Sequence, residues 1–239
     1  MYPLNFRENR KYPAILSIHG GPKTTFGNIF NHEMQLFAQK GYFVIYTNPR
    51  GSDGFGDDFS DIRGKYGTID YDDLMKCLDN AIENISQIDI LNLGVMGGSY
   101  GGFMTNWIIG HTDRFKAAIS QRGISNWINK FVTTDIGFYF NEDQIGATPW
   151  DNPKKLWDCS PLRYANYVKT PTLFIHSQED YRCYLPESIS MFTALKYHGV
   201  DSKLVIFKGE NHDLSRTGRP KSRFKRLQSM LDFFEDYLK

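Results

Sequence analysis

The chain has 239 residues, of which 28 are basic and 27 are acidic. A length of this order suits one large α/β domain with a full hydrophobic core. The balanced charge argues against a nucleic-acid-binding surface and against attraction to anionic lipid.

The sequence also carries no signal for export or membrane insertion. No apolar run approaches the roughly 20 residues that cross a bilayer, and the opening residues MYPLNFRENRKYP lack the apolar stretch of a secretory signal. The three cysteines, Cys77, Cys159 and Cys183, lack CxxC spacing, which argues against a disulfide framework and a zinc site. We therefore expect a cytoplasmic protein with reduced thiols, no metal and no membrane partner.

Six apolar runs rich in β-branched and aromatic residues alternate with stretches of helical periodicity. This pattern predicts an α/β fold with a mostly parallel sheet and helices on both faces. No repeat or linker interrupts it, so residues 1–239 are expected to form a single domain. The predicted strands are residues 14–18, 42–46, 93–96, 117–120, 172–175 and 204–207.

The first strand is followed by a glycine loop, His19-Gly20-Gly21-Pro22. Its glycines let the backbone turn amide groups toward a site, while Pro22 donates no hydrogen bond. An ordinary glycine turn is the alternative. Between the second and third strands, apolar residues at helical spacing predict a helix that covers one face of the sheet: Leu74, Leu78, Ala81, Ile82 and Ile85.

The third strand ends in the most informative motif of the chain, Gly97-Gly98-Ser99-Tyr100-Gly101-Gly102, and residues 103–109 after it can form a helix. A serine in a sharp turn from strand to helix points its hydroxyl out of the sheet, and the crowded turn needs small neighbours. A lone GxSxG can arise by chance in a glycine-rich loop. The strand, turn and helix context instead predicts Ser99 as the nucleophile of an α/β-hydrolase fold.

Residues 122–168 are rich in aromatic side chains but show little periodicity. Two interpretations stay open: an insertion over the active site, or a loop-rich surface layer. We expect Phe138, Tyr139 and Phe140 to contribute to an apolar pocket for the substrate. The aromatic residues of the whole segment include Trp127, Phe131, Phe138, Tyr139, Phe140, Trp150 and Trp157.

A serine hydroxyl needs a base to take its proton, and the base needs a partner that fixes its tautomer. In α/β hydrolases the acid comes before the histidine, both after the serine. Asp180 lies in a loop beyond strand 172–175, and His212 lies in a loop beyond strand 204–207. Because the carboxyl ends of parallel strands form one edge, Ser99, Asp180 and His212 can converge there.

Other residues compete for these roles. Glu179 and Asp213 are alternative acids, but Glu179 would point differently and Asp213 is too close to its neighbour in sequence. His176 ends a buried strand, which favours a structural role. The remaining candidates for the general base lie on or beside predicted helices, where an imidazole is usually solvated or partly packed: His32, His111 and His198.

The chain ends with two further amphipathic helices. Residues 187–198 carry Ile189, Phe192 and Leu195 on one side, before a possible left-handed Gly199. The last helix repeats the pattern with Leu227, Met230, Leu231, Phe234 and Leu238.

The tetrahedral intermediate of acyl transfer needs about two fixed N–H donors. The amide of Tyr100, directly after the nucleophile, is one by the geometry of the turn. The second N–H donor is expected from the loop His19-Gly20-Gly21-Pro22, because this loop follows an early strand, where the fold places the oxyanion hole.

Together the motifs HGGP, GGSYGG, HSQED followed by Tyr181-Arg182, and GENH resemble the catalytic domain of the prolyl oligopeptidase family, most closely its acylaminoacyl peptidase branch. The resemblance runs from about Tyr12 to the C-terminus and implies Ser99, Asp180 and His212 as the triad. It also implies the Gly21 and Tyr100 amides as the oxyanion hole and Arg182 as a ligand for a substrate carbonyl. For Arg182, the alternatives are a surface cation or an ion pair with Glu179.

The chain departs from the family in two places. Prolyl oligopeptidases proper have a tyrosine where His19 stands, which favours the acylaminoacyl branch. Family members usually carry an N-terminal β-propeller, whereas only about a dozen residues precede strand 14–18, too few for a four-stranded blade. We expect an ungated site and an exposed sheet edge that could support a homo-oligomer.

The sequence thus predicts a serine hydrolase that cleaves peptide or N-acyl-peptide bonds through an acyl-enzyme. A carboxylesterase acting on short or medium acyl esters is the first alternative, and a noncatalytic binding module is the second. No phosphate-binding GxxxxGK[ST] or proper GxGxxG motif occurs, so no cofactor is expected.

Overall fold

The computed structural model describes residues 1–239 and is built around one six-stranded sheet in the order β2-β1-β3-β4-β5-β6. Every neighbouring pair is parallel. The predicted α/β-hydrolase fold, with all six strands, is confirmed. The strands are β1 (Tyr12–Ile18), β2 (Phe43–Tyr46), β3 (Ile88–Gly98), β4 (Ala117–Gln121), β5 (Thr172–Ser177) and β6 (Ser202–Phe207).

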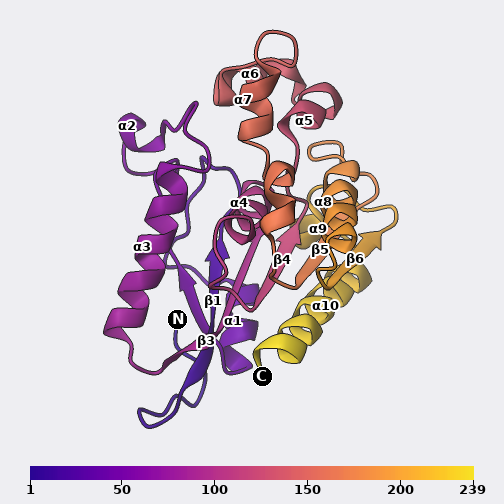
Figure 1. Ribbon diagram of the computed structural model, residues 1–239. Coiled ribbons are helices and arrows are strands. Elements are labelled where there is room, and N and C mark those ends of the chain that lie inside the picture. Colours follow the sequence, from indigo (N-terminus) through magenta and orange to yellow (C-terminus); the bar gives the residue numbers. More distant parts are fainter.

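Helices cover both faces of the sheet (Figure 1). One face packs against α3 (Ile69–Asn84), α4 (Tyr100–Ile109) and α8 (Pro186–Tyr197), whose buried side chains include Leu74, Phe103 and Leu195. The other face packs against α1 (His32–Gln39) and α10 (Pro220–Leu238), with Phe37 and Phe234 at its centre. A strand buried on both sides is mostly apolar, which is why β1, β4 and β5 contain short apolar runs and have their polar residues mainly near the strand ends.

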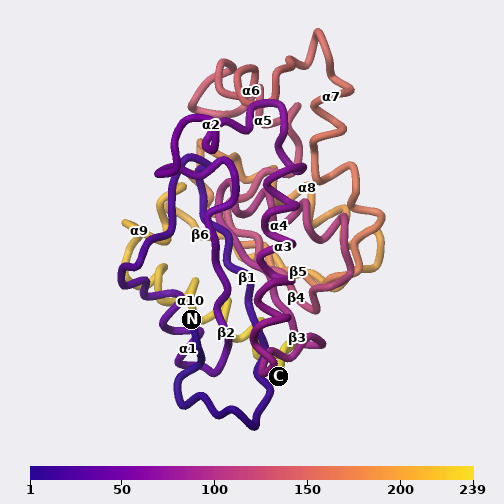
Figure 2. The backbone as a smooth tube through the Cα atoms, turned by 90° about the vertical axis from the view of Figure 1, so that its left-hand side faces the viewer, coloured from indigo at the N-terminus to yellow at the C-terminus, as the bar shows by residue number.

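The aromatic-rich segment forms short helices rather than an irregular layer. Both views place α5, α6 and α7 beyond the carboxyl ends of the strands (Figures 1 and 2). Their caps are encoded locally: Asn126 and Asn152 accept hydrogen bonds from first-turn amides, and α6 ends at Gly146 in the left-handed conformation. The elements are α5 (Trp127–Thr133), α6 (Gly137–Ile145), α7 (Pro153–Asp158) and the 3-10 helix η1 (Pro161–Tyr167).

The two sheet edges differ in how they are covered. On β2, the terminal amino group of Met1 donates to the Val44 carbonyl at 2.8 Å, and the Val44 amide donates to the Met1 carbonyl at 3.1 Å. On β6, the exposed Lys203 places a charge on the edge strand, a common means of discouraging edge pairing. Self-association through these edges stays a prediction. None of the helices combines the length and apolar character needed to span a bilayer.

Candidate active site

Ser99 lies at the sharp turn between β3 and α4, and its φ of 61° is in the region that glycine favours. At this turn, backbone atoms pack directly against backbone atoms, with no room for side chains. A Cβ on Gly97 would lie 2.3 Å from the Gly101 carbonyl oxygen, and a Cβ on Gly101 would lie 2.3 Å from that of Ile18. The Ser99 amide donates to the Gln121 carbonyl at 3.0 Å, which fixes the turn against the end of β4. These glycines therefore hold the Ser99 hydroxyl above the sheet.

Asp180 lies in the turn after β5 and is only 1% exposed. Its Oδ1 accepts hydrogen bonds from the amides of Arg182 at 3.0 Å and Cys183 at 2.9 Å. Beneath it, the buried His176 ring contacts the Cys183 carbonyl at 2.6 Å and the Ser188 hydroxyl at 2.7 Å. The carboxylate is thus held with Oδ2 free to face the histidine.

His212 lies in the loop after β6 and bridges the other two side chains. Its Nδ1 is 2.7 Å from Asp180 Oδ2, and its Nε2 is 3.0 Å from Ser99 Oγ. The loops of Asp180 and His212 are joined by a hydrogen bond of 3.0 Å from the Glu179 amide to the Glu210 carbonyl. The structure therefore brings together the three residues that the sequence predicts as the triad.

Burial lowers the pKa of His212, and the charges of Arg122 and Arg182 lower it further, while Asp180 acts in the opposite direction. The imidazole is therefore mostly neutral at pH 7, with Nε2 able to accept the serine proton. The competing acids are placed elsewhere. The Glu179 side chain is exposed, and Asp213 is paired with Arg216.

The glycine loop after β1 lies beside the sharp turn that carries Ser99, which we call the elbow. A Cβ on Gly20 would lie 3.5 Å from Ser99 Cβ. His19 holds this loop, with Nδ1 at 2.7 Å from the Gly20 carbonyl and Nε2 at 2.9 Å from the Ser52 hydroxyl. Gly21 has a φ of 122°, which a larger residue would strain to adopt. Burial lowers the pKa of His19, which favours a neutral ring.

Tyr100 is the first residue of α4, where an amide has no acceptor within the helix. Its hydroxyl donates to Asp70 Oδ2 at 2.7 Å, and both side chains are buried. Burial raises the pKa of Asp70. Asp70 thereby anchors the residue next to the nucleophile. The sequence did not predict this role, and the one signal for it is the position of Asp70 in the first turn of α3.

A cavity of about 280 Å³ opens in front of Ser99, with both Gly21 and Tyr100 in its wall. The aromatic-rich segment closes it with Ile124, Trp127, Lys130, Ile136 and Phe140. The expectation for Phe138 and Tyr139 was wrong, because these side chains are 65% and 64% exposed and only Phe140 faces the cavity. Consecutive residues of α6 point in different directions around the helix axis, so three in a row cannot share one wall.

Arg182 also lines the cavity, and it is paired with Asp135 rather than with Glu179. Its Nε lies 2.6 Å from Asp135 Oδ1, and the Asp135 amide donates to the Tyr181 carbonyl at 2.8 Å. The buried Lys130 donates to the Arg182 carbonyl at 2.6 Å. The segment after α5 is thereby held against the Asp180 loop. The two residues are 47 positions apart, and no sequence motif predicts their contact.

The completely buried Glu187 of α8 holds the start of the same segment. Its Oε2 accepts from the amides of Ser125 and Asn126, each at 2.8 Å, and its Oε1 accepts from Asn129 Nδ2 at 2.7 Å. Burial raises the pKa of Glu187, although these donors favour its ionised form.

The substitution Glu187→Ala is expected to lower the free energy of unfolding by about 3 kcal/mol, because it leaves the buried amide of Ser125 and the partly buried amide of Asn126 without an acceptor. Urea unfolding monitored by circular dichroism measures the change. The exposed Glu142 on α6 is the matched control, and Glu142→Ala should stay within about 0.5 kcal/mol of the wild type. Equal midpoints and slopes for the two variants would contradict a structural role for the Glu187 carboxylate.

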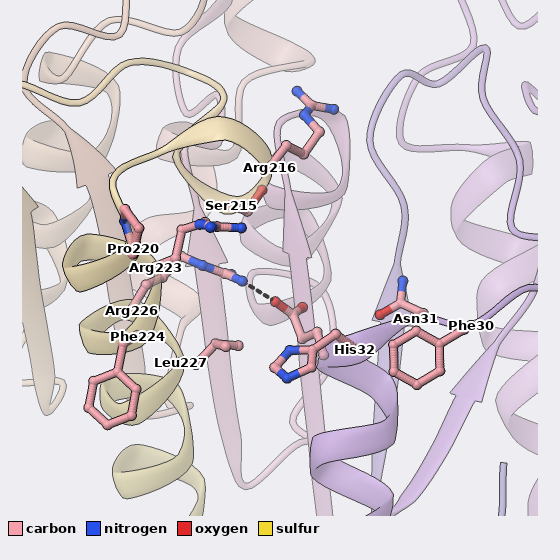
Figure 3. A pocket seen from close by; sticks show the side chains of 11 residues that line it. Phe30, Asn31, His32, Ser215, Arg216, Pro220, Arg223, Phe224, Arg226 and Leu227 are labelled. Atoms are coloured by element: carbon pink, nitrogen blue, oxygen red, sulfur yellow. Dashed lines mark hydrogen bonds and ion pairs between the residues drawn. The ribbon is translucent and has the colours of Figure 1, made fainter.

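A larger cavity of about 630 Å³ lies between α1 and α10 and does not include Ser99 (Figure 3). Arg226 pairs there with Glu33 at 2.6 Å. Arg216 lines both cavities, and Figure 3 shows its guanidinium pointing away from that of Arg226. In neither cavity, nor elsewhere in the chain, are three or more His, Cys, Asp or Glu side chains grouped so that they could hold a metal ion.

Comparison with known proteins agrees with this geometry. The model of the prolyl oligopeptidase family matches residues 28–239. An uncharacterized peptidase of Bacillus subtilis, YuxL, is 48% identical over 239 residues, which are 100% of this chain and 36% of the relative. A dipeptidyl-peptidase 5 of Schizosaccharomyces pombe is 35% identical over 88% of this chain and 31% of its own length.

Among solved structures, an acylaminoacyl peptidase of Pyrococcus horikoshii superposes with a TM-score of 0.96 at 41% identity, over 100% of this chain and 39% of that one. The chain thus spans between 31% and 39% of the length of these relatives. The match covers the elbow, the loops of Asp180 and His212, and the aromatic-rich segment alike. The chain belongs to the prolyl oligopeptidase family.

Proposed function

We propose that residues 1–239 form one catalytic domain of a serine peptidase in which Ser99, His212 and Asp180 are the catalytic triad. The observation that carries the proposal is the continuous hydrogen-bonded path from Asp180 through His212 to Ser99, with distances of 2.7 and 3.0 Å. Geometry of this kind lets a histidine take the serine proton while a buried carboxylate fixes its tautomer.

In the proposed reaction, Ser99 Oγ attacks the scissile carbonyl carbon while its proton passes to His212 Nε2. The oxyanion is stabilised by the amides of Gly21 and Tyr100, both of which line the cavity. The same histidine gives the proton to the leaving amine, and a water molecule then hydrolyses the acyl-enzyme. Arg182, held by Asp135, would donate to a substrate carbonyl near the scissile bond.

We propose peptides or N-acylated peptides as substrates. The relatives are named as peptidases, an acylaminoacyl peptidase among them. Trp127, Ile136 and Phe140 give the cavity an apolar wall suited to an apolar side chain. Residues 122–168 would then act as an insertion over the active site.

Ester hydrolysis is the second candidate, because the same triad cleaves esters and an ester carries a better leaving group. Labelling with a fluorophosphonate probe tests whether Ser99 is reactive, and the Ser99→Ala variant is the control. Turnover of an N-acetyl-amino-acid anilide is then compared with that of the matched p-nitrophenyl ester. A large preference for the ester would favour the esterase, and absence of labelling in the folded protein would favour a noncatalytic binding module.

The lowered pKa of His212 predicts the pH dependence of the reaction. Only the neutral imidazole accepts the serine proton, so kcat/KM should fall on the acid side with an apparent pKa below the ordinary histidine value of about 6.5. Burial and the neighbouring arginines cause the shift. A profile of kcat/KM from pH 4 to 9 with the anilide tests this, and an acid limb above pH 7 would contradict it.

A cytoplasmic location is also part of the proposal. Its support is that Cys77, Cys159 and the buried Cys183 are all unpaired, as expected in a reducing compartment. Fractionation of cells that produce the protein, followed by immunodetection, tests the location. Recovery outside the cytoplasm would overturn it.

A further inference from the structure

Arg122 follows β4 directly and has a φ of 41°, in the left-handed region that arginine rarely adopts. Its amide donates to the Ile175 carbonyl at 2.8 Å, which holds this backbone between β4 and β5. A strained non-glycine residue at a sheet's carboxyl edge is a common feature of functional sites. The conformation turns Arg122 into the wall of the cavity that contains Ser99 and His212.

The guanidinium group occupies space left free by Gly98, the residue before the nucleophile. A Cβ on Gly98 would lie 3.0 Å from both Cζ and Nη1 of Arg122. The positive charge of Arg122 lowers the pKa of His212. Arg122 therefore lies beside the elbow, within electrostatic reach of the general base.

Arg122 differs from the neighbouring arginines because it has no acidic partner. Arg182 is paired with Asp135, Arg216 with Asp213, and Arg226 with Glu33, the last pair being drawn in Figure 3. The Nε of Arg122 is buried without a hydrogen-bond partner, and no ion pair involves its guanidinium. Burial together with Arg216 and Arg226 lowers the pKa of Arg122 to about 10, which still leaves it charged at neutral pH.

We infer that Arg122 binds the carboxylate of the fragment that leaves when the acyl-enzyme forms. The inference rests on the proposed function. His212 hands its proton to the leaving amine, so a cation beside it can reach that fragment. Arg182 also acts on His212 but is held by Asp135 and is assigned to a substrate carbonyl, so the unpaired Arg122 is assigned to the leaving fragment. In a peptide with one residue after the scissile bond, the terminal carboxylate lies about one residue spacing, roughly 3.5 Å, beyond the scissile carbonyl carbon.

This arrangement favours short peptides whose last residue is removed with a free carboxyl group. A carboxylate on a planar guanidinium forms two charge-assisted hydrogen bonds, and it supplies the partner that the Arg122 guanidinium lacks. An amide at the same place would leave the charge of Arg122 uncompensated.

The test compares kcat/KM for N-acetyl-Phe-Ala, its C-terminal amide, and N-acetyl-Phe-Asp amide, whose only carboxylate is the side chain. The wild type is expected to prefer the free acid over its amide by about 30-fold. Arg122→Met should reduce this ratio to near 1, and Arg122→Lys should keep part of it. Arg223→Met, which removes a cation from the neighbouring cavity, is the matched control and should keep the full ratio.

Using a ratio separates substrate binding from a general effect on His212, because a change in the histidine alters both peptides equally. Equal turnover of acid and amide by the wild type, or an unchanged ratio in Arg122→Met, would overturn the inference. A preference for the aspartyl amide alone would overturn the assignment to the terminal carboxylate. In each of these cases fluorophosphonate labelling and hydrolysis of the amide would leave the proposed peptidase standing, whereas loss of both in the wild type would contradict the peptidase itself.

Discussion

The Ser99→Ala variant is expected to lose about 10⁵-fold in kcat/KM toward an N-acetyl-amino-acid anilide. The substitution removes the only atom that can form the acyl-enzyme, and His212 Nε2, 3.0 Å from Ser99 Oγ, loses the proton donor it faces. Alanine fits the elbow without new contacts, so the fold should be retained. Progress curves at high enzyme concentration, with circular dichroism as a check of folding, measure the effect.

A serine outside the site provides the comparison. Ser229 of α10 donates only to the Lys225 carbonyl within its own helix, and Ser229→Ala should stay within about twofold of the wild type. More than 1% residual activity in purified Ser99→Ala, free of wild-type enzyme, would contradict the nucleophile assignment.

Asp180→Asn is expected to lower kcat by about 10⁴-fold while leaving the structure nearly unchanged. The two amides of Arg182 and Cys183 both donate to Oδ1, so an asparagine would place its carbonyl oxygen there and its NH₂ toward His212. The ring would then accept at Nδ1 and carry its proton on Nε2, facing Ser99. A histidine in that tautomer cannot act as the base.

The neighbouring carboxylate is the matched control for this variant. Glu179 is exposed, its side chain does not reach His212, and Glu179→Gln should change kcat less than about twofold. A large loss in Glu179→Gln with little loss in Asp180→Asn would show that the acid had been assigned to the wrong residue.

The sheet and the convergence of the three loops could be predicted because each depends on local sequence. β-branched runs such as residues 172–175 determine a strand wherever they are buried, and the residues after such strands must meet at one edge. Gly97 and Gly101 mark the elbow for a reason within the motif itself, since any side chain there collides with backbone.

The structure of the aromatic-rich segment, residues 122–168, could not be predicted in the same way, because distant residues hold it in place. The start of α5 depends on Glu187, about 60 residues away, and Arg182 depends on Asp135 across 47. Aromatic content left open whether the segment covers the site or forms a surface layer, and it did not indicate which ring faces inward. Only the rotation of α6 decides that Phe140 lines the cavity while Phe138 and Tyr139 face solvent.

The position of Arg122 in the cavity wall could not be predicted from the sequence either. Its position depends on a backbone angle and on the missing side chain of Gly98, and neither has a periodic signature.

The glycine packing at the elbow also limits how the enzyme can lose activity. Gly101 abuts the last backbone groups of β1, and Gly102 abuts the Gln121 carbonyl at the end of β4, without side-chain atoms between them. The turn therefore cannot unfold locally while the sheet stays folded. Heating should not produce a partly opened, folded but inactive state at this position; inactivation and the cooperative collapse of the central strands should occur as one transition.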